Sequence, residues 1–423
     1  MSTKSSRTRS RRSRRSAAPD WFAPPRLRGY IWDPCDAYDA RDREQLLSIR
    51  LETNRTCNLR CRYCNLDRNA PGDVPYDALI DVVRQARDLG ARSIVVGGSG
   101  EPTLHPRFLD LIAFIRQQGL IPVVFSNLLA VTPDLAAFLY EHDVSVMGKL
   151  DSLRPEVQDY LAGARGAAVR IHAGLDALLD AGYAGRPDQQ DLRLGLAFVS
   201  CRINIDELET LWLFCRTRGI FPHIEILSSG HAHRHLPQAH LSTREILQSK
   251  LRLLEIDRRD FGYDWLPYTP IAAGTCLQHL AGLYVTAAGD VRPCAHTRLD
   301  DHPALRDGDG LYPYNVRRLS LKDIYHSDLF EYLRHIDLHL EGHCGDCENH
   351  DRCIGCRGFA YTVGVARGLT PRQALRSQCL LCLKQPLAVR DAGTPCPSKA
   401  PAPSLASPHR PDNSAPPAAA TSA

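Results

Sequence analysis

The sequence predicts an α/β fold: a partial (β/α)6 barrel of the TIM type, followed by a cysteine-rich C-terminal domain. Two observations support this prediction. Short apolar segments alternate with amphipathic helical segments between about residues 47 and 227, as expected for parallel strands joined by helical crossovers. Beyond residue 227 the alternation stops, and eight of the 15 cysteines lie between residues 276 and 382. We therefore expect one barrel domain and a smaller domain built around cysteines.

Each predicted helix has an apolar face, and each predicted strand is a short apolar run. The segment 76–89, for example, places Leu79, Val82, Val83 and Ala86 on one side of a helix, which indicates a face packed on a sheet. The expected strands are 47–51, 93–96, 121–126, 144–150, 192–199 and 223–227, and the expected helices are 76–89, 106–118, 133–141, 169–180, 205–218 and 243–254.

The two ends of the chain have compositions that cannot bury enough apolar surface to fold. Residues 1–18 are rich in Arg and Ser, and residues from about 391 onward are mostly Pro, Ala and Ser. We expect a disordered tail and lead-in over 1–45, the barrel over 46–230, a connecting segment over 231–271, the cysteine-rich domain over 272–387 and a second tail over 388–423.

Charge and hydropathy exclude several classes of protein. The net charge is +4, but seven basic residues in the first 18 leave −3 for the remainder, so we expect no nucleic-acid partner. The sequence has no apolar run of about 18 residues, and its Arg-rich start is not followed by an apolar signal core. We expect a cytoplasmic protein without membrane segments, whose cysteines serve metal or redox chemistry rather than disulfides.

Three cysteines stand close together directly after the first predicted strand. Cys57, Cys61 and Cys64 follow the spacing C-x3-C-x2-C, with Tyr63 immediately before the last of them. Three thiolates on one loop can hold three irons of a [4Fe–4S] cluster and leave the fourth iron open for a cofactor or substrate. The alternative, a structural zinc site, requires four ligands in paired units, which this loop does not supply.

This loop resembles the signature of the radical S-adenosylmethionine (SAM) superfamily, and the segment GGSGEP at 97–102, after the second predicted strand, resembles another element of that family. The resemblance implies that SAM binds the open iron and that its reductive cleavage yields a 5′-deoxyadenosyl radical, which abstracts a hydrogen atom from the substrate. It also implies a contact between SAM and the turn, whose backbone carbonyls and glutamate would accept from the methionine ammonium. The turn residues assigned to SAM are Gly97, Gly98, Gly100, Glu101 and Pro102.

Further residues near strand ends match the family more faintly. The resemblance assigns Ser126 and Asn127 to the ribose or carboxylate of SAM, and Tyr63 to the same site. Lys149 departs from the family pattern, and it either faces a substrate carboxylate or lies solvated at the barrel rim. Asp151 and Asn204 also follow strands, at the end where parallel barrels carry their chemistry.

The C-terminal cysteines follow a regular pattern as well. Eight cysteines suffice for two four-ligand clusters, whereas two C-x2-C pairs equally frame a zinc ribbon. The combined pattern resembles the SPASM extension of radical SAM enzymes, which carries two auxiliary iron–sulfur clusters. It reads C-x12-G-x4-C for Cys276, Gly289 and Cys294, then C-x2-C-x5-C-x2-C for Cys344, Cys347, Cys353 and Cys356, and ends in the pair Cys379 and Cys382.

The SPASM resemblance implies interleaved ligands. The chain departs from the family in the short gap before Cys356 and in having no further cysteine just before Cys276. The fourth ligand of the first auxiliary cluster therefore stays open: it is the spare member of the last pair, or that iron is left for substrate. The implied sets are Cys276, Cys294 and Cys356 for the first auxiliary cluster, and Cys344, Cys347 and Cys353 with Cys379 or Cys382 for the second.

Auxiliary clusters favour oxidation of the substrate. The resemblance implies a radical SAM oxidoreductase that matures a ribosomal peptide by modifying a side chain, with SAM, three [4Fe–4S] clusters and an electron donor such as flavodoxin or ferredoxin. A nearly level alternative is a small-molecule dehydrogenase or a related natural-product enzyme. A sulfatase maturase is less favoured, because Ala295 stands where that class has an acidic base. A non-catalytic zinc or iron–sulfur protein is the last alternative, and the catalytic residues are unassigned. The His-rich segment 231–235 is either a solvated loop or a contact for an anionic substrate.

Overall fold

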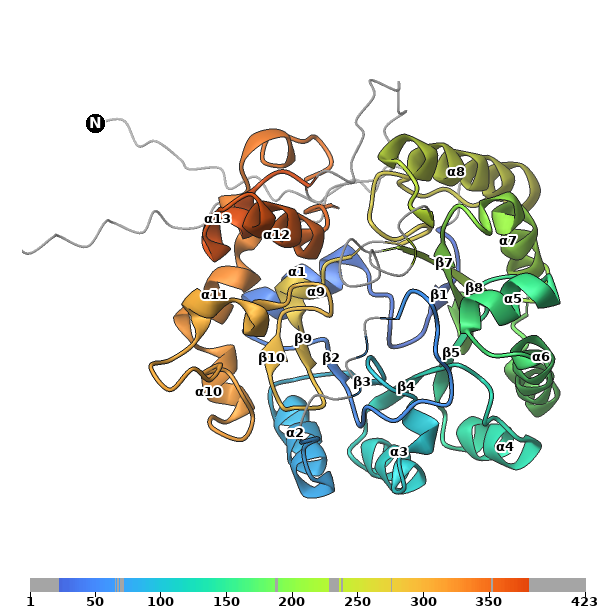
Figure 1. Cartoon of the computed structure of the whole chain (residues 1–423), viewed down its shortest axis with the longest axis horizontal. Helices are drawn as coiled ribbons and strands as arrows, with labels where there is room; N and C mark the ends of the chain where they lie inside the picture. The colour runs from blue at the N-terminus through green and yellow to red at the C-terminus, as the bar shows by residue number, and fades with distance from the viewer. Residues whose placement is uncertain are drawn as a thin grey trace, which may run out of the picture.

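The computed structural model describes residues 23–379, except 65, 67, 69–71, 187–188, 228–235, 237–238, 275 and 351–352. Its centre is a curved sheet with the strand order β10-β9-β2-β3-β4-β5-β7-β8, and helices cover the convex side of this sheet (Figure 1). Neighbouring strands from β2 to β8 in this order are parallel. The predicted partial barrel with a cysteine-rich C-terminal domain is therefore confirmed.

The strands of the barrel lie within two residues of their predicted bounds. Every residue of β3 and β7 is buried, because one face packs on helices and the other faces the barrel interior. The strands are β1 (Arg26–Leu27), β2 (Ser48–Leu51), β3 (Ser93–Val96), β4 (Ile121–Ser126), β5 (Ser145–Lys149), β6 (Asp191–Leu192), β7 (Leu194–Ser200), β8 (Phe221–Ile226), β9 (Gly282–Val285) and β10 (Val291–Arg292).

The predicted helices are present, and α5 is an additional one between β5 and β7. Pro133 and the side chain of Thr132, which accepts from Leu135 N at 3.2 Å, begin α4. No helix in the described ranges is long and apolar enough to span a bilayer. The helices are α1 (Pro34–Asp42), α2 (Tyr76–Asp88), α3 (Phe108–Gln117), α4 (Pro133–Glu141), α5 (Pro155–Ala162), α6 (Ala167–Leu178), α7 (Leu208–Arg216), α8 (Thr243–Ile256), α9 (Gln278–Ala281), α10 (Leu321–Tyr325), α11 (Asp328–Arg334), α12 (Arg357–Ala366) and α13 (Pro371–Arg376).

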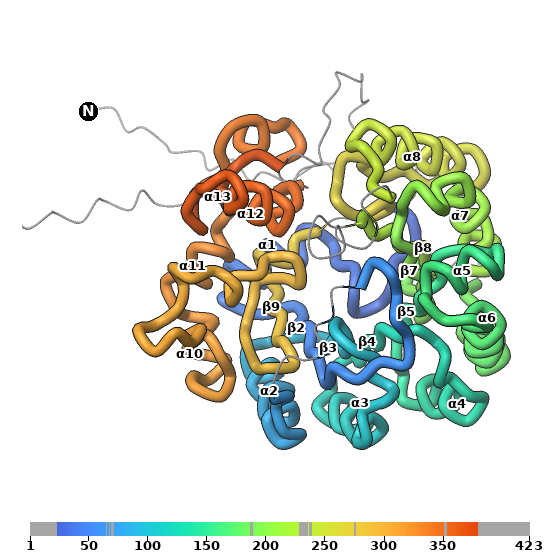
Figure 2. The backbone as a smooth tube through the Cα atoms, viewed as in Figure 1, coloured from blue at the N-terminus to red at the C-terminus, as the bar shows by residue number. Residues whose placement is uncertain are grey.

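The hairpin β9–β10 extends the barrel sheet with a distant part of the chain. β9 pairs in parallel with β2, so that Arg50 lies opposite Tyr284, and β10 is antiparallel to β9. Figure 2 shows the yellow β9 segment beside the blue β2 segment. The hairpin lies within the predicted C-terminal domain, 272–387, and continues the sheet of the barrel. Cys276 and Cys294, which precede and follow the hairpin, are therefore close in sequence to strands of the barrel sheet.

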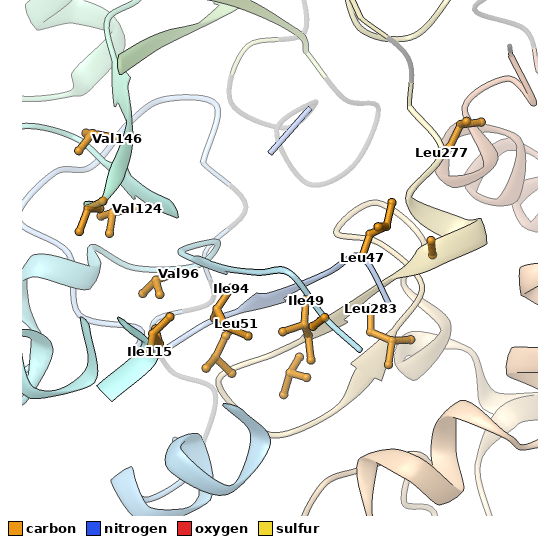
Figure 3. Packing of buried hydrophobic residues seen from close by; sticks show 14 of the residues in the cluster. Leu47, Ile49, Leu51, Ile94, Val96, Ile115, Val124, Val146, Leu277 and Leu283 are labelled. Carbon is orange, nitrogen blue, oxygen red and sulfur yellow. The ribbon is translucent and has the colours of Figure 1, made fainter. Parts of the chain in front are cut away.

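Two apolar layers hold the barrel together. Outside the sheet, the side chains of Ile49, Leu51, Val96 and Leu283 pack in the main core (Figure 3). Inside, the N-terminal segment around β1 contributes to a second cluster with buried residues of the barrel strands. That inner cluster contains Leu27, Ile31, Val95, Val123, Met147, Leu192, Ala197 and Phe221. The polar residues described below lie around the rest of the interior.

A buried carboxylate fastens α7 to the end of α8. Asp257 is fully buried and accepts from Trp212 Nε1 at 2.7 Å, from Trp265 Nε1 at 2.9 Å and from Arg216 Nη2 at 2.7 Å. Asp257→Ala would leave the Arg216 guanidinium buried without its counter-ion, so we expect the free energy of unfolding to fall by about 3–5 kcal/mol.

Urea unfolding followed by tryptophan fluorescence measures this change. Asp260→Ala is the matched control, because it removes a carboxylate from the exposed pair with Arg259 and should leave the unfolding midpoint nearly unchanged. Similar effects of the two variants would contradict the role of Asp257.

Candidate active site

The first three cysteines lie on the loop that follows β2. Burial, together with nearby Asp151, Cys64 and Cys57, raises the pKa of the Cys61 thiol to about 12, so the three thiols share one site. The loop is fastened to the C-terminal end of α5 by two backbone hydrogen bonds, from Arg60 N to Ala162 O at 3.3 Å and from residue 62 N to residue 161 O at 3.0 Å. The thiols are therefore held above the carboxyl ends of the barrel strands.

The turn 97–102 packs directly against this loop. A side chain at Gly98 would place its Cβ 2.3 Å from Tyr284 Oη, and one at Gly100 would place it 2.3 Å from Asn54 O. Both glycines have positive φ angles, 152° and 76°, which other residues rarely adopt. Residue 101 N donates to Thr56 O at 2.7 Å. These glycines are therefore required for the close approach of the two segments.

Glu101 is a buried part of the turn, with 2% of its surface exposed. Its carboxylate accepts from Thr103 Oγ1 at 2.7 Å, from Ser126 Oγ at 2.9 Å and from Asn127 N at 2.7 Å. Burial raises its pKa, and these hydrogen bonds act in the opposite direction. Glu101 therefore joins the turn to the end of β4, which is a positioning role that the sequence resemblance did not include.

Asn127 connects β4 to the cysteine loop. Its Nδ2 donates to Asn58 Oδ1 at 2.7 Å and lies 3.8 Å from Cys57 Sγ. The next residue, Leu128, is buried with a positive φ of 66°, a conformation that is uncommon for a residue other than glycine. The strained backbone after β4 thus directs the Asn127 amide toward the first cysteine.

A second buried carboxylate, Glu52, was missed by the sequence reasoning. It accepts from Ser99 N at 2.9 Å and from Ala287 N at 2.8 Å, and it forms a short hydrogen bond with Tyr284 Oη. Burial, and then Glu52, raise the pKa of Tyr284 well above its usual range. The sequence feature that could have identified Glu52 is its position as an acidic residue directly after an apolar strand.

Polar side chains from β5 and β8 form a network beside the cysteine loop. Lys149 Nζ lies 3.2 Å from a carboxylate oxygen of Asp151 and 3.2 Å from one of Glu225, and Tyr63 Oη donates to Asp151. Burial alone would raise the pKa of Glu225, but Lys149 holds it at about 2. Lys149 is therefore paired inside the barrel rather than solvated at its rim.

Asn204 serves the fold. It is fully buried, and its Nδ2 donates to Asp151 O at 2.8 Å and to Val199 O at 2.9 Å, so its amide joins the ends of β5 and β7.

Arg50 faces the barrel interior from β2. Its guanidinium lies 4.1 Å from the centre of the Phe125 ring and 5.7 Å from that of Tyr30. In the described part of the chain, Arg50 Nε and Nη2 have no hydrogen-bond partner, and no carboxylate lies within 4.0 Å of this side chain. The alternation along β2 indicated the direction of Arg50 in the sequence. Ile49 and Leu51 point outward into the main core (Figure 3), so the residue between them points toward the barrel interior.

Five of the C-terminal cysteines lie close together: Cys276, Cys294, Cys344, Cys356 and Cys379. Burial raises the pKa of Cys356 well above its usual range, and the thiols of Cys379, Cys294 and Cys276 raise it further. Cys379 also borders Cys344, because Cys379 N donates to Cys344 Sγ at 3.3 Å. Cys382 lies outside the described residues, as does the His-rich segment 231–235. Cys201 and Cys215 are buried.

The cysteine sets fit iron–sulfur clusters in the chemistry of their donors. Backbone amides donate to several sulfurs, from Cys356 N to Cys379 Sγ at 3.2 Å, from Gly355 N to Cys353 Sγ at 3.3 Å and from residue 359 N to Cys356 Sγ at 3.4 Å. Such hydrogen bonds stabilise thiolates and tune clusters. No three His, Cys, Asp or Glu side chains among the described residues converge as ligands of a single metal ion. A cubane instead takes its thiolates on separate irons.

His223 on β8 provides a pH-dependent contribution to stability. It is 3% exposed, and burial lowers its pKa to about 4. The unfolded chain, in which a histidine has a pKa near 6.5, therefore binds a proton that the folded chain rejects, and stability falls as the pH drops below about 6.5. From pH 7 to pH 5 we expect His223 to cost about 2 kcal/mol.

Urea unfolding at the two pH values measures this contribution. His223→Gln should lose less stability than the parent on acidification, whereas His339→Gln, which changes an exposed residue, should behave as the parent does. An unchanged acid sensitivity in His223→Gln would disprove the assignment.

Two family models match the chain. The radical SAM superfamily model matches residues 51–188, and the SPASM model, that of an iron–sulfur cluster-binding domain, matches residues 276–348. The first range contains the cysteine loop, the turn 97–102 and Asn127. The second contains the hairpin β9–β10 and the first C-terminal cysteines.

Relatives match over most of the chain. It is 22% identical to the AdoMet-dependent heme synthase of Nitratidesulfovibrio vulgaris, over 74% of this chain and 88% of that protein. It is 24% identical to the mycofactocin maturase MftC of Mycobacterium tuberculosis, over 83% of this chain and 87% of MftC. The structure of Streptococcus suis SuiB bound to S-adenosylmethionine has the same fold, with a TM-score of 0.61 and 15% identity over 80% of this chain and 77% of SuiB. With the barrel and its cysteine sets, these matches show that the chain belongs to the radical SAM superfamily and is an iron–sulfur enzyme with a C-terminal SPASM domain.

Proposed function

We propose that this enzyme oxidises a side chain of a peptide, as a maturase of ribosomal peptides. The observation that carries this proposal is the match to two proteins of that kind: MftC is named a maturase, and SuiB has also been solved bound to its precursor peptide SuiA. When bound, the clusters and SAM would supply hydrogen-atom abstraction and an acceptor for the remaining electron. An electron donor such as flavodoxin or ferredoxin would serve as reductant.

The ligand sets support three [4Fe–4S] clusters. Cys379 borders both Cys344 and Cys356, and we propose it as the fourth ligand of the second auxiliary cluster, one of the two assignments that the family pattern allows. The first auxiliary cluster would then be completed by Cys382 or by a substrate group. The proposed ligands are Cys57, Cys61 and Cys64 for the SAM cluster, Cys276, Cys294 and Cys356 for the first auxiliary cluster, and Cys344, Cys347, Cys353 and Cys379 for the second.

For SAM itself, we propose contacts with the turn 97–102, Ser126, Asn127 and Tyr63. The buried carboxylate of Glu101 holds these residues in place, because it accepts hydrogen bonds from Ser126 and Asn127 at the end of β4 and from Thr103 after the turn. The glycine backbone comes close enough to a ligand because no Cβ stands in the way. The hydrogen bond from Tyr63 Oη to the carboxylate of Asp151 fixes the orientation of the Tyr63 ring.

The barrel interior supplies a binding group for the substrate. The charge of Arg50 lowers the pKa of both Glu225 and Cys276. Arg50 therefore lies between the Lys149 network and the first auxiliary set. Arg50 carries two guanidinium nitrogens without a partner among the described residues. Guanidinium groups stacked on aromatic rings bind carboxylates well. We propose that Arg50 binds an acidic group of the peptide near the reacting side chain.

A small-molecule substrate is the second candidate. The observation that favours it is the similarity to an AdoMet-dependent heme synthase, 22% identity over 74% of this chain, compared with 24% over 83% for MftC.

Anaerobic reconstitution with iron and sulfide, followed by incubation with SAM and dithionite, tests the chemistry. We expect about twelve irons per chain and formation of 5′-deoxyadenosine. Addition of a short precursor peptide encoded beside the gene should then give a peptide that has lost two hydrogens, detected by mass spectrometry. Cleavage of SAM without any change in the peptide would contradict the peptide proposal and favour a small-molecule substrate.

Glu101→Gln tests the support of the SAM site. The amide replaces one accepting oxygen by a donor, so at least one of the bonds to Thr103, Ser126 or Asn127 is lost. Because a hydrogen bond to a charged group contributes about 1.5–3 kcal/mol, we expect the Kd for SAM to rise about tenfold or more, with the iron content unchanged. Asp110→Asn, at an exposed pair with Arg107, is the control. An unaltered Kd, measured by equilibrium dialysis, would refute this role.

Arg50→Gln tests the substrate contact. We expect formation of modified peptide to fall about tenfold or more, because a charge-assisted hydrogen bond is lost, while 5′-deoxyadenosine still forms without peptide. Arg84→Gln provides a matched control, since Arg84 lies over the Phe114 ring outside the barrel. A parallel loss of both products in Arg50→Gln would show that Arg50 acts on SAM rather than on the substrate.

A further inference from the structure

Arg357 is a buried cation beside the C-terminal cysteines. It is the first residue of α12, directly after Cys356, and only 1% of its surface is exposed. Its Nη1 donates to Leu375 O at 2.9 Å and to Ser377 O at 2.8 Å. Carbonyl groups satisfy its hydrogen bonds on that side, but they carry no net charge. The guanidinium therefore needs an anion from elsewhere.

The other side of the guanidinium faces sulfur. Arg357 Nη2 lies 3.6 Å from Cys344 Sγ. The glycine before Cys356 makes room for this contact, because a Cβ at Gly355 would come 2.7 Å from Arg357 Nη2 and 2.7 Å from Cys379 Cβ. The backbone is thus shaped so that the cation reaches the sulfur.

Among the described residues, some buried arginines have a carboxylate partner and Arg334 bonds the carbonyl of Tyr325, whereas Arg357 bonds a cysteine sulfur. Arg41 pairs with Asp337 at 2.9 Å, and Arg216 pairs with Asp257 at 2.7 Å. Within the described ranges no carboxylate lies within 4.0 Å of Arg357. A buried cation without a carboxylate is costly, and among the described residues the guanidinium bonds the sulfur of Cys344. The geometry therefore pairs the cation with one of the proposed cluster ligands.

We propose that Arg357 is the counter-ion of the second auxiliary cluster and raises its reduction potential. This inference rests on the proposed assignment of Cys344 and Cys379 to that cluster. Reduction adds one negative charge, which a neighbouring cation stabilises, and cluster potentials follow net charge and hydrogen bonds to sulfur. Arg357 thereby favours the second auxiliary cluster as the acceptor of the electron removed from the substrate.

The first auxiliary set has different neighbours. Cys294 Sγ contacts Thr297 Oγ1 at 3.2 Å, and this hydroxyl lies 3.0 Å from His279 Nε2. Burial lowers the pKa of His279 to about 3, so this chain of contacts is neutral. Arg292 acts on Cys294 electrostatically, but Asp300 neutralises it, and Arg50 acts on Cys276 in the same way without a hydrogen bond to its sulfur among the described residues. The direct hydrogen bond from Arg357 to Cys344 Sγ therefore distinguishes the two sets.

The experiment uses the full-length chain with Cys57, Cys61 and Cys64 all changed to Ala, so that only auxiliary clusters assemble. Arg357→Met removes the charge at similar volume, and Arg357→Lys keeps it. Iron content and a redox titration followed by electron paramagnetic resonance are measured for each. At the midpoint potential of the parent, we expect Arg357→Met to lower the ratio of reduced to oxidised second cluster about tenfold, which is ~59 mV for one electron. Arg357→Lys should retain most of the parent value.

Arg334→Met is the matched control. Arg334 is also buried and bonds a carbonyl, that of Tyr325, but within the described residues it makes no hydrogen bond to a cysteine, so its removal should not move the potential. Loss of the second cluster from Arg357→Met but not from Arg357→Lys also supports the counter-ion role. An unchanged potential in Arg357→Met, or loss of the cluster from both Arg357 variants, would overturn it. If the parent itself binds no auxiliary cluster, the proposed function fails instead.

Discussion

The carboxylate of Glu52 lies where three parts of the chain meet: the end of β2, the turn 97–102 and the hairpin β9–β10. It accepts one backbone N–H from the turn and one from the hairpin, and it also bonds the hydroxyl of Tyr284. Each of these donors is in a buried region, where an unpaired donor costs about 1–3 kcal/mol. Since Cys57 follows Glu52 closely and Cys294 follows β10, this one carboxylate sets the relative position of the SAM-cluster loop and the first auxiliary set.

The hairpin that Glu52 holds in place also covers the open edge of β2. In a partial barrel the first strand would have an unpaired edge, which is a site for unwanted pairing. β9 covers that edge in parallel register, from Ser48 beside Gly282 to Leu51 beside Val285. The SPASM region thus completes the sheet as well as carrying cysteines, so the two matched regions form one structural unit.

Charge within the barrel is arranged unevenly. Lys149 is paired with two carboxylates and Arg292 with Asp300. Arg50 instead lies over the rings of Phe125 and Tyr30, and among the described residues Glu225 acts on it only from beyond 4.0 Å. The Glu225 side chain retains 37% exposure, so the interior near the strand ends admits solvent. A polar, partly open interior with one unpaired cation differs from the packed core of a closed barrel. It suits an acidic substrate group held between the cysteine sets.

Sequence patterns predicted the features that depend on local order. Strand and helix periodicity predicted the six barrel strands, which the structure confirms. Cysteine spacing predicted one ligand set on the first loop, because thiolates on one loop must be close together, and the ligand sets stay a prediction. The hairpin β9–β10 could not be recognised, since its strands are short and its partner β2 is more than 230 residues away. The roles of Glu52 and Glu101 were also inaccessible, because their donors come from distant segments. Arg50 was readable as an inward position, but its missing carboxylate is a property of the folded interior.

The first cysteine loop and the C-terminal cysteines differ in how well the protein positions them without a metal. The first cysteine loop is bonded to α5 and lies over a barrel with a large apolar core. The C-terminal cysteines are carried by loops and by helices of 10 residues or fewer. Burial raises the pKa of Cys276 to about 12, so its thiol stays protonated unless a metal binds. Because coordination deprotonates a thiol, metal binding and thiolate formation are one event, and the free energy of that event is available to fold the C-terminal loops. The cation at Arg357 then has its anion only when the metal is present, so charge balance in this region couples its folding to its cofactor.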